Sequence, residues 1–261
     1  GGDGRIMLTL AEAELHLPEG ILLNQSFGSV FHGVLISEIN KEWAGRMHEQ
    51  QVRPYSQYLL VKEGKPYWRL AALTKEVFCH ILQPMMRKGS LFLEQKGYEV
   101  GLGDFHMVKQ DSFQGLEERF WTGTDKVHHI DMEFLTSASF KKNGEYMIFP
   151  ELPLVFNNLI RKWNVYSDSM VLGEERLGNK LAESMCITDY RLHTHPFSVE
   201  GRRIRAFRGS IRLGLFKDDI TRRMASMLGA FADYAGIGIK TAMGMGAVHS
   251  DIAYYQKKER L

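Results

Sequence analysis

Four glycines within eleven residues constrain the fold of this chain more than any other stretch. Residues 236–246 read GIGIKTAMGMG, with Lys240 and Thr241 between two G-x-G pairs. Glycine reaches positive φ without a clash at Cβ and lets another backbone approach closely. Residues 219–234 before the loop have the pattern of a helix, and residues 247–252 after it have that of a strand. The chain therefore runs helix, glycine loop, strand.

This order and spacing argue against two familiar nucleotide-binding loops. A P-loop has glycine directly before Lys-Thr, where this chain has Ile239, and a dinucleotide fingerprint has its third glycine where this chain has Thr241. Both motifs also lead from a strand into a helix. Exposed N–H groups of a glycine loop can hold phosphate oxygens, and Lys240 adds a positive charge. From the loop alone, two interpretations stay open: an anion-binding loop, and a connection that only turns the chain.

The composition is that of an ordinary globular protein. Apolar residues make up 44% and charged residues 25%, and the net charge is +2, so a site for a polyanion must come from a local basic cluster. Cys79 and Cys186 are too few for a disulfide framework and lack metal-ligand spacing, which favours a reducing, cytoplasmic location. No apolar run is long enough to span a bilayer. The first four residues resemble a cloning remnant ahead of Met7 and are left out of the fold prediction.

Hydrophobic periodicity predicts the same order of elements in each half of the chain. In the first half the expected segments are a strand at 7–17, a helix at 27–40, a helical piece at 42–49, a hairpin of 55–62 and 67–73, a helix at 74–86 and apolar runs over 91–108. In the second half they are a strand at 127–140, a helix within 150–167, strands at 186–195 and 204–216, and the helix and strand that flank the glycine loop. Two β-α-β-β-α-β units predict an α+β fold of two tandem ferredoxin-like domains, at 7–115 and 120–261.

Five arginines lie within eleven residues that contain no acid: Arg202, Arg203, Arg205, Arg208 and Arg212. On a continuous strand, two of them would share one face and three the other. Such a stripe, with Phe207 interleaved, suits phosphate contacts and base stacking. The arginine density favours a nucleic-acid site over the alternative, which is a solvated edge strand carrying guard charges.

Two histidines are candidates for acid–base chemistry. His32 falls near the start of the predicted first helix, and His48 falls in the helical piece that follows it. Cleavage of RNA without a metal requires one group to take the 2′-hydroxyl proton and another to protonate the departing 5′-oxygen. Two imidazoles could do both, and Arg53 could stabilise charge on the phosphate. The alternative is that they are surface or packing residues, as most of the ten histidines in the chain would be.

Other side chains that could carry chemistry have simpler interpretations. Two histidine pairs resemble metal-site fragments but lack a matching carboxylate or cysteine set, so no metal is predicted: His128-His129 and His193-Thr194-His195. His193 and His195 would share a strand face, which leaves a metal site as a minor alternative. The aromatic residues of the predicted hairpin could stack on bases but are interpreted as core: Tyr55, Tyr58, Tyr67 and Trp68.

Four segments carry a resemblance to a known family: the glycine loop with its pairs Gly236/Gly238 and Gly244/Gly246, the run from His195-Pro196-Phe197 through Arg202 to Gly209, Met47-His48-Glu49 followed by Arg53-Pro54-Tyr55-Ser56, and Phe134-Leu135-Thr136. With these motifs the chain resembles the CRISPR repeat-specific endoribonucleases of the RAMP superfamily, which make guide RNAs from a long precursor. The glycine loop is specific to the superfamily, and the His48 segment points to its endonuclease branch.

The resemblance implies two ferredoxin-like domains and metal-independent cleavage without a cofactor, leaving 2′,3′-cyclic phosphate and 5′-hydroxyl ends. It implies His48 as the leading acid or base, His32 as its partner and Arg53 as an electrostatic helper. Some members use a tyrosine in the first helix; this helix has none, and His32 takes that role. The implied RNA-binding residues are Gly236, Gly238, Lys240, Thr241, Gly244, Gly246, Arg202, Arg203, Arg205 and Arg208.

The implied partner is CRISPR repeat RNA, with other CRISPR effector subunits as a second class of partner and no membrane association. The protein would act as a monomer or a homodimer. The rival function is a non-cutting RNA-binding subunit of a CRISPR effector complex, with the same folds and the same glycine loop.

Overall fold

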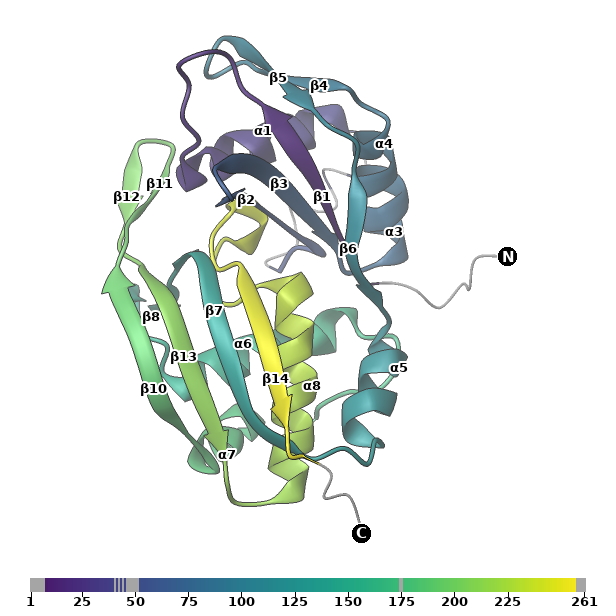
Figure 1. Ribbon diagram of the computed structural model, residues 1–261, viewed down its shortest axis with the longest axis vertical. Helices are drawn as coiled ribbons and strands as arrows, with labels where there is room; N and C mark the ends of the chain where they lie inside the picture. Colours follow the sequence, from purple (N-terminus) through teal and green to yellow (C-terminus); the bar gives the residue numbers. More distant parts are fainter. Residues whose placement is uncertain are drawn as a thin grey trace.

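The computed structural model describes residues 8–39, 41, 43, 45, 52–173 and 176–256. Two antiparallel sheets dominate it, one in the upper and one in the lower half of Figure 1, and the glycine loop (residues 236–246) lies between them. Within these described residues, no helix has both the length and the apolar character needed to cross a membrane.

The first sheet has the strand order of a ferredoxin-like unit. Its strands pair antiparallel in the order β2-β3-β1-β6. The elements are β1 (Leu8–His16), α1 (Gly28–Glu38), β2 (Tyr55–Lys62), β3 (Lys65–Ala72), a helical segment of α3 (Lys75–Val77), a π-turn (Phe78–Leu82) and α4 (Gln83–Met86), a hairpin of β4 (Ser90–Leu93) and β5 (Tyr98–Leu102), and β6 (His106–Asp111). The Thr74 hydroxyl accepts from Val77 N and begins the second helical segment, as the sequence predicts.

The second sheet repeats this arrangement in the order β10-β13-β7-β14, again antiparallel throughout. Its elements are β7 (Val127–Ala138), α6 (Leu152–Tyr166), β10 (Met185–Thr194), β13 (Phe207–Leu215), α8 (Asp219–Ala235) and β14 (Val248–Tyr254). The carboxylate of Asp218 accepts from Thr221 N at 2.7 Å and caps α8. The predicted α+β class with two ferredoxin-like units is therefore confirmed.

Short elements that the periodicity does not predict complete the fold: η1 (Gln25–Phe27), α5 (Phe113–Leu116) with a helical turn (Glu117–Trp121), β8 (Phe140–Lys142), β9 (Glu145–Met147), α7 (Leu177–Glu183), β11 (Phe197–Val199), β12 (Arg202–Ile204) and η4 (Thr241–Met243). The prediction of one strand over 204–216 is wrong. Residues 205–206 break it, because Arg202–Ile204 turns back on Phe197–Val199 as a separate hairpin. The helical piece at 42–49 falls mostly outside the described residues, and the domain limits 7–115 and 120–261 stay a proposal.

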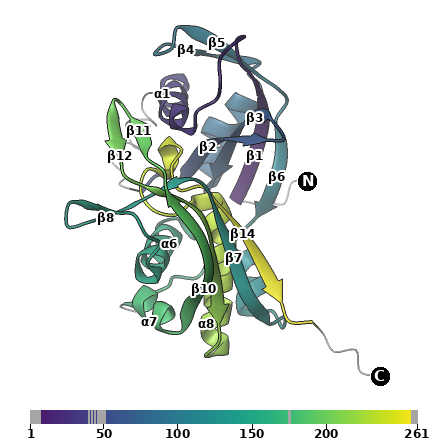
Figure 2. The same cartoon turned by 60° about the vertical axis from the view of Figure 1, so that its left-hand side comes forward.

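The two units share a hydrophobic core. The face of the first sheet that points away from α1 packs against α8, so that Leu10 and Tyr58 lie in one buried cluster with Phe231 and Tyr234. The hydroxyl of Ser56 donates to the Tyr234 carbonyl at 2.6 Å within this contact. Figure 2 shows α8 running up to the underside of the first sheet. This packing fixes α1, on the other face of that sheet, relative to the glycine loop that follows α8.

Candidate functional site

His32 lies on α1 in contact with two residues at the start of β2. The imidazole is buried, with 6% of the residue exposed. Arg53 Nη1 lies 2.7 Å from His32 Nε2, and the Tyr55 hydroxyl lies 3.0 Å from His32 Nδ1. The rings of His32 and Tyr55 are stacked, with centroids 6.0 Å apart. Both ring nitrogens of His32 thus have a partner: Arg53, just before β2, at Nε2, and Tyr55, the first residue of β2, at Nδ1.

The chemistry of these partners assigns the tautomer of His32. A guanidinium only donates, so Nε2 accepts from Arg53 and carries no proton. The neutral ring then has its proton on Nδ1, which donates to the Tyr55 oxygen. Burial raises the pKa of the Tyr55 phenol to about 12, against the opposing charge of Arg53, so the phenol stays neutral near pH 7. The site therefore presents a neutral imidazole whose Nε2 lone pair lies beside a fixed cation.

The structure brings together His32 and Arg53, two of the three residues predicted to be catalytic. The third, His48, lies outside the described residues, so its role stays a prediction. Arg53 is half-buried and lies next to the buried His32. An anion bound by the outer N–H groups of Arg53 would therefore lie near Nε2 of His32.

The glycine loop is a close-packed joint between the two units. A Cβ on Gly28, the first residue of α1, would lie 2.6 Å from the Met243 carbonyl oxygen and 3.0 Å from Gly244 Cα. Gly244 has φ of +104°, which side chains rarely adopt. Glycine on both sides lets helix and loop backbones touch. The sequence analysis did not single out Gly28, because nothing near it in sequence signals this contact.

Most N–H groups of the glycine loop already have acceptors within the protein. Gly238 N donates to Asn158 Oδ1, Ile239 N to the Ser139 carbonyl and Gly246 N to the Ser137 carbonyl, each at 2.9 Å. The four glycines of the loop are buried, whereas Lys240 is exposed in a left-handed conformation and Thr241 is half-buried. The glycines are therefore explained by the second interpretation, in which the loop turns the chain and lets two backbones approach closely. An anion would contact Lys240 rather than the glycine N–H groups.

Lys162 on α6 supports the loop from inside the protein. It is 5% exposed, and its ammonium donates to the carbonyls of Gly236 at 3.2 Å and Gly238 at 3.1 Å. Burial, with a smaller effect of the neighbouring Arg161 charge, lowers the pKa of Lys162 to about 7. The carbonyls act in the opposite direction, because they lie at the negative C-terminal end of α8. The sequence analysis also missed Lys162, since a single lysine in an amphipathic helix is typical of a solvated position.

The predicted arginine stripe is divided between two places. Arg202 and Arg203 are exposed on the β11–β12 hairpin, Arg205 is exposed in the bend after it, and Arg208 is half-buried on β13. Arg212 pairs with both carboxylate oxygens of Asp131 on β7, at 2.7 and 3.0 Å. The expectation of one five-arginine stripe is therefore corrected, because the bend separates the first three arginines from β13 and Arg212 already holds an acid.

The β11–β12 hairpin packs on the glycine loop and reaches the first unit. Phe197, Val199 and Ile204 form a small core with Met245 of the loop. Ser198 N donates to Ser26 Oγ, just before α1, at 3.0 Å. Figure 1 shows the hairpin rising beside α1. The exposed arginines of the hairpin, Lys240 and the first turn of α1 thus belong to segments that meet at the joint between the two units.

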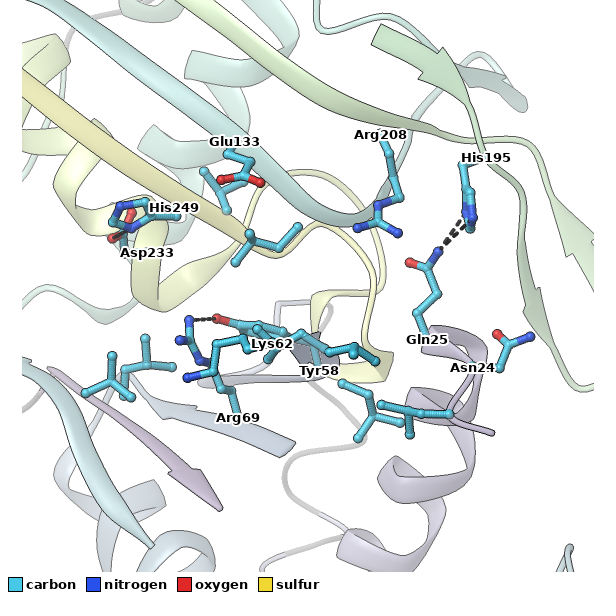
Figure 3. Close-up of a pocket in the computed structure, with 18 of the residues that line it drawn as sticks. Asn24, Gln25, Tyr58, Lys62, Arg69, Glu133, His195, Arg208, Asp233 and His249 are labelled. Atoms are coloured by element: carbon cyan, nitrogen blue, oxygen red, sulfur yellow. Dashed lines mark hydrogen bonds and ion pairs between the residues drawn. The ribbon is translucent and has the colours of Figure 1, made fainter. Parts of the chain in front are cut away.

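A cleft of about 700 Å³ opens between the two sheets (Figure 3), and His32 is not among the residues that line it. Several of its cations are already paired: Lys62 and Arg69 contact Glu12 at 2.7 and 3.0 Å, and Lys109 contacts Asp233. At one end, Gln25 Nε2 lies 2.7 Å from His195 Nδ1 and joins the two units. This pairing neutralises much of the charge that lines the cleft.

The histidine pairs considered for a metal site are engaged in other contacts. His195 Nδ1 also lies 2.8 Å from Ser137 Oγ. Burial lowers the pKa of His195, and the neighbouring Arg208 and His193 lower it further. His128 contacts His129 and packs edge-on against Tyr255. Over the part of the chain that the structure describes, no three histidine, cysteine or acidic side chains are grouped to hold a metal ion.

Comparison with known proteins finds similarity to one family of endoribonucleases. The family model described as CRISPR-associated endoribonuclease Cas6 matches residues 132–248. A protein of that name from Streptococcus thermophilus is 29% identical over 238 residues, covering 86% of this chain and 91% of the relative. Another from Mycobacterium tuberculosis is 29% identical over 262 residues, covering 95% and 80%.

Solved structures share the fold over nearly the whole chain. A Cas6 product complex superposes with a TM-score of 0.77 at 20% identity, covering 94% of this chain and 99% of that one. Thermus thermophilus Cas6 gives a TM-score of 0.73 at 21% identity, covering 95% and 100%. The resemblance to CRISPR-associated endoribonucleases, predicted from the motifs, is confirmed by the family match and by these relatives, and the solved structures add the shared fold.

Proposed function

We propose that this chain is a metal-independent endoribonuclease that binds CRISPR repeat RNA and cuts the precursor at one phosphate. The similarity to relatives described as CRISPR-associated endoribonucleases supports the substrate class. The observation that carries the chemistry is the Arg53–His32–Tyr55 arrangement, which fixes a neutral imidazole beside a guanidinium.

In the proposed reaction, His32 is the general base. Its Nε2 takes the proton of a ribose 2′-hydroxyl, and the resulting oxygen attacks the adjacent phosphorus. The bond from phosphorus to the 5′-oxygen breaks, and His48 gives that oxygen a proton. The products are a 2′,3′-cyclic phosphate and a 5′-hydroxyl, with no water or oxidant consumed. Arg53 turns from Nε2 to the phosphate and stabilises its developing charge.

The base role for His32 follows from its protonation state. With Nε2 accepting from Arg53, His32 has no proton to give at that nitrogen. A second proton on the ring would face the guanidinium at close range, which like-charge repulsion disfavours. The acid must then be another residue, and His48 is the candidate that the sequence offers.

The RNA would reach this site along the side of the joint that carries the β11–β12 hairpin. Arg202, Arg203 and Lys240 are exposed there and can contact phosphates. Arg205 and Thr241 extend this surface, and the half-buried Arg208 lines the cleft of Figure 3, where it would contact RNA that enters the cleft. The buried glycines of the loop contribute by shaping it, since most of their N–H groups have protein acceptors.

The test is cleavage of a labelled repeat RNA in EDTA by the parent protein, His32→Ala and His48→Ala. A matched RNA with a 2′-deoxy sugar at the cut site is the chemical control. His128→Ala is the control variant. His128 packs against Tyr255 near the start of β7, whereas the glycine loop contacts Ser137 near the end of that strand. We expect the parent and His128→Ala to cut, the deoxy RNA to survive, and each of the other variants to bind RNA but to lose rate by roughly a hundredfold or more.

Two results would contradict the proposal. Cleavage that stops in EDTA would indicate a metal-dependent nuclease. Tight binding without any cleavage would leave only the rival function, an RNA-binding subunit of a CRISPR effector complex.

A further inference from the structure

Gln57 on β2 is fully buried between α1, β3 and the glycine loop. Its side-chain nitrogen donates to the Gly28 carbonyl at 2.7 Å and to the Ala242 carbonyl at 2.8 Å. Its side-chain oxygen accepts from Trp68 Nε1 at 2.9 Å. Carbonyls only accept and an indole N–H only donates, so the orientation of the amide is determined by its partners. A single side chain thus joins four segments of the fold.

The segments that Gln57 joins are those that the proposed reaction needs. Gly28 and His32 are four residues apart on α1 and therefore lie on the same face of the helix. Tyr55, which contacts His32 Nδ1, is two residues from Gln57 and points to the same face of the sheet. Ala242 belongs to the turn between Lys240 and Gly244. Gln57 therefore sets the distance between the helix that carries His32 and the loop that carries Lys240.

We propose that Gln57 is a positioning residue for RNA cleavage, which places His32 relative to RNA held at the glycine loop. This inference rests on the proposed function. Gln57 is buried away from solvent, so it touches no RNA and acts through Gly28 and Ala242. Replacing its amide removes the hydrogen bonds that tie the Gly28 and Ala242 carbonyls together, and α1 is then free to shift against the loop while the exposed cations keep their places.

The experiment compares single-turnover cleavage with RNA binding in Gln57→Met and Gln57→Glu. The methionine keeps the length of the side chain but has no N–H group, and the glutamate carboxylate faces two carbonyls with only acceptors. We expect the cleavage rate to fall by about tenfold or more in both variants, because small displacements of a base are costly. The Kd for a non-cleavable 2′-deoxy repeat RNA should change by less than about threefold, since phosphate contacts dominate affinity.

Two controls separate positioning from stability. Met85→Ala removes buried volume from the same core on α4, a segment to which the Gln57 amide makes no hydrogen bond, so it should lower Tm but leave the rate of the folded protein unchanged. The second control is pH. The introduced carboxyl of Gln57→Glu can donate to one carbonyl when it is protonated, so the ratio of the Gln57→Glu rate to the Gln57→Met rate should rise as the pH falls. Equal rate losses in Met85→Ala and the Gln57 variants, at equal folded fraction, would overturn the proposal.

A measurement without cleavage keeps this inference apart from the proposed function. The ring ¹⁵N chemical shifts of His32, assigned by their loss in His32→Ala, report its tautomer. The parent should show the Nδ1–H form, and Gln57→Met should show a mixture of forms. Unchanged shifts in Gln57→Met would overturn the positioning role whether or not the parent cuts RNA. A parent that never cuts, with shifts that change in Gln57→Met, would overturn the proposed function and leave Gln57 only its effect on the placement of His32.

Discussion

Arg53 Nη1 donates to His32 Nε2 across 2.7 Å, so the imidazole of this site is neutral and its unprotonated nitrogen faces a cation. The contact has two consequences for the proposed reaction. It keeps the base unprotonated, and it holds a guanidinium where the phosphate would bind.

Replacing Arg53 should therefore slow cleavage more than binding. We expect Arg53→Ala to lower the single-turnover rate by roughly a hundredfold, because the charge developing on the phosphate loses its stabilising donor. Arg53→Lys should recover part of the rate, since it keeps the charge without the planar donor set. Arg212→Ala is the matched control, because Arg212 pairs with Asp131. An Arg53→Ala protein that cuts at the parent rate would remove Arg53 from the mechanism.

Removal of the Tyr55 hydroxyl tests the tautomer. In Tyr55→Phe, His32 Nδ1–H loses its acceptor, and a buried unsatisfied donor costs about 1–3 kcal/mol of stability. We expect the cleavage rate to fall by about tenfold while RNA affinity stays unchanged, because the ring loses the partner that holds its orientation and small displacements of a base are costly. The measurements are single-turnover kinetics and urea unfolding. A lowered stability with an unchanged rate would mean that Tyr55 only packs against His32.

The exposed cations should contribute to affinity through phosphate contacts. Arg202→Ala, Arg203→Ala and Lys240→Ala should each weaken binding of repeat RNA and reduce the slope of log K against log salt by about one. Cleavage of saturated enzyme should be little affected. The measurement is a salt titration of RNA binding by each variant. A slope that stays at the parent value would show that the residue makes no phosphate contact.

The lowered pKa of Lys162 predicts that the stability of the protein depends on pH. Its pKa in the folded protein is about 7, below its ordinary value of 10.5, so between these values the folded state binds fewer protons than the unfolded state. The free energy of unfolding should therefore rise with pH from about 7 to 10, and the burial of the charge weakens the fold most below pH 7. Lys162→Met should lack this rise, while the exposed-site control Lys142→Met should keep it. Parallel curves for the parent and Lys162→Met in urea unfolding would mean that the loop carbonyls keep Lys162 charged throughout.

Two glycines on α1 should respond in opposite ways to alanine. Gly28→Ala places a Cβ 2.6 Å from the Met243 carbonyl oxygen, so we expect a loss of about 1–3 kcal/mol in stability together with a lower cleavage rate. Gly33→Ala meets nothing closer than 3.9 Å and should stabilise the helix by about 0.5–1 kcal/mol. Thermal unfolding of both variants checks the contrast. An equal effect of the two substitutions would mean that α1 does not depend on its contact with the loop.

Periodicity in the sequence predicts the main strands and helices well, because the alternating and helical patterns are local. The order of β7, α6, β10, β13, α8 and β14 follows from them. The break at residues 205–206 could not be predicted, since the hairpin of Arg202–Ile204 with Phe197–Val199 is stabilised by a core shared with the distant Met245. The same holds for Arg212, whose partner Asp131 lies on another strand.

The glycine loop illustrates a second limit. Its sequence indicates exposed N–H groups, but the acceptors that occupy them come from Ser137, Ser139 and Asn158, far away in the chain. Gln57 gives a weaker signal that could have been noticed. It shares one face of β2 with the apolar Tyr55 and Leu59, and a polar residue at such a buried position needs partners in the interior.

The contact of Gly28 with Met243 and Gly244 also bears on the order in which the chain is made. The helix that carries His32 emerges early in synthesis, whereas the surface on which it begins emerges only with the final segments described here, and the Gln57–Ala242 bond spans 185 positions. A nascent chain thus carries His32, with its partners Arg53 and Tyr55, long before the loop on which α1 rests is made. For the proposed reaction, this means that the base and the loop that positions its helix come together only after translation has passed the glycine loop.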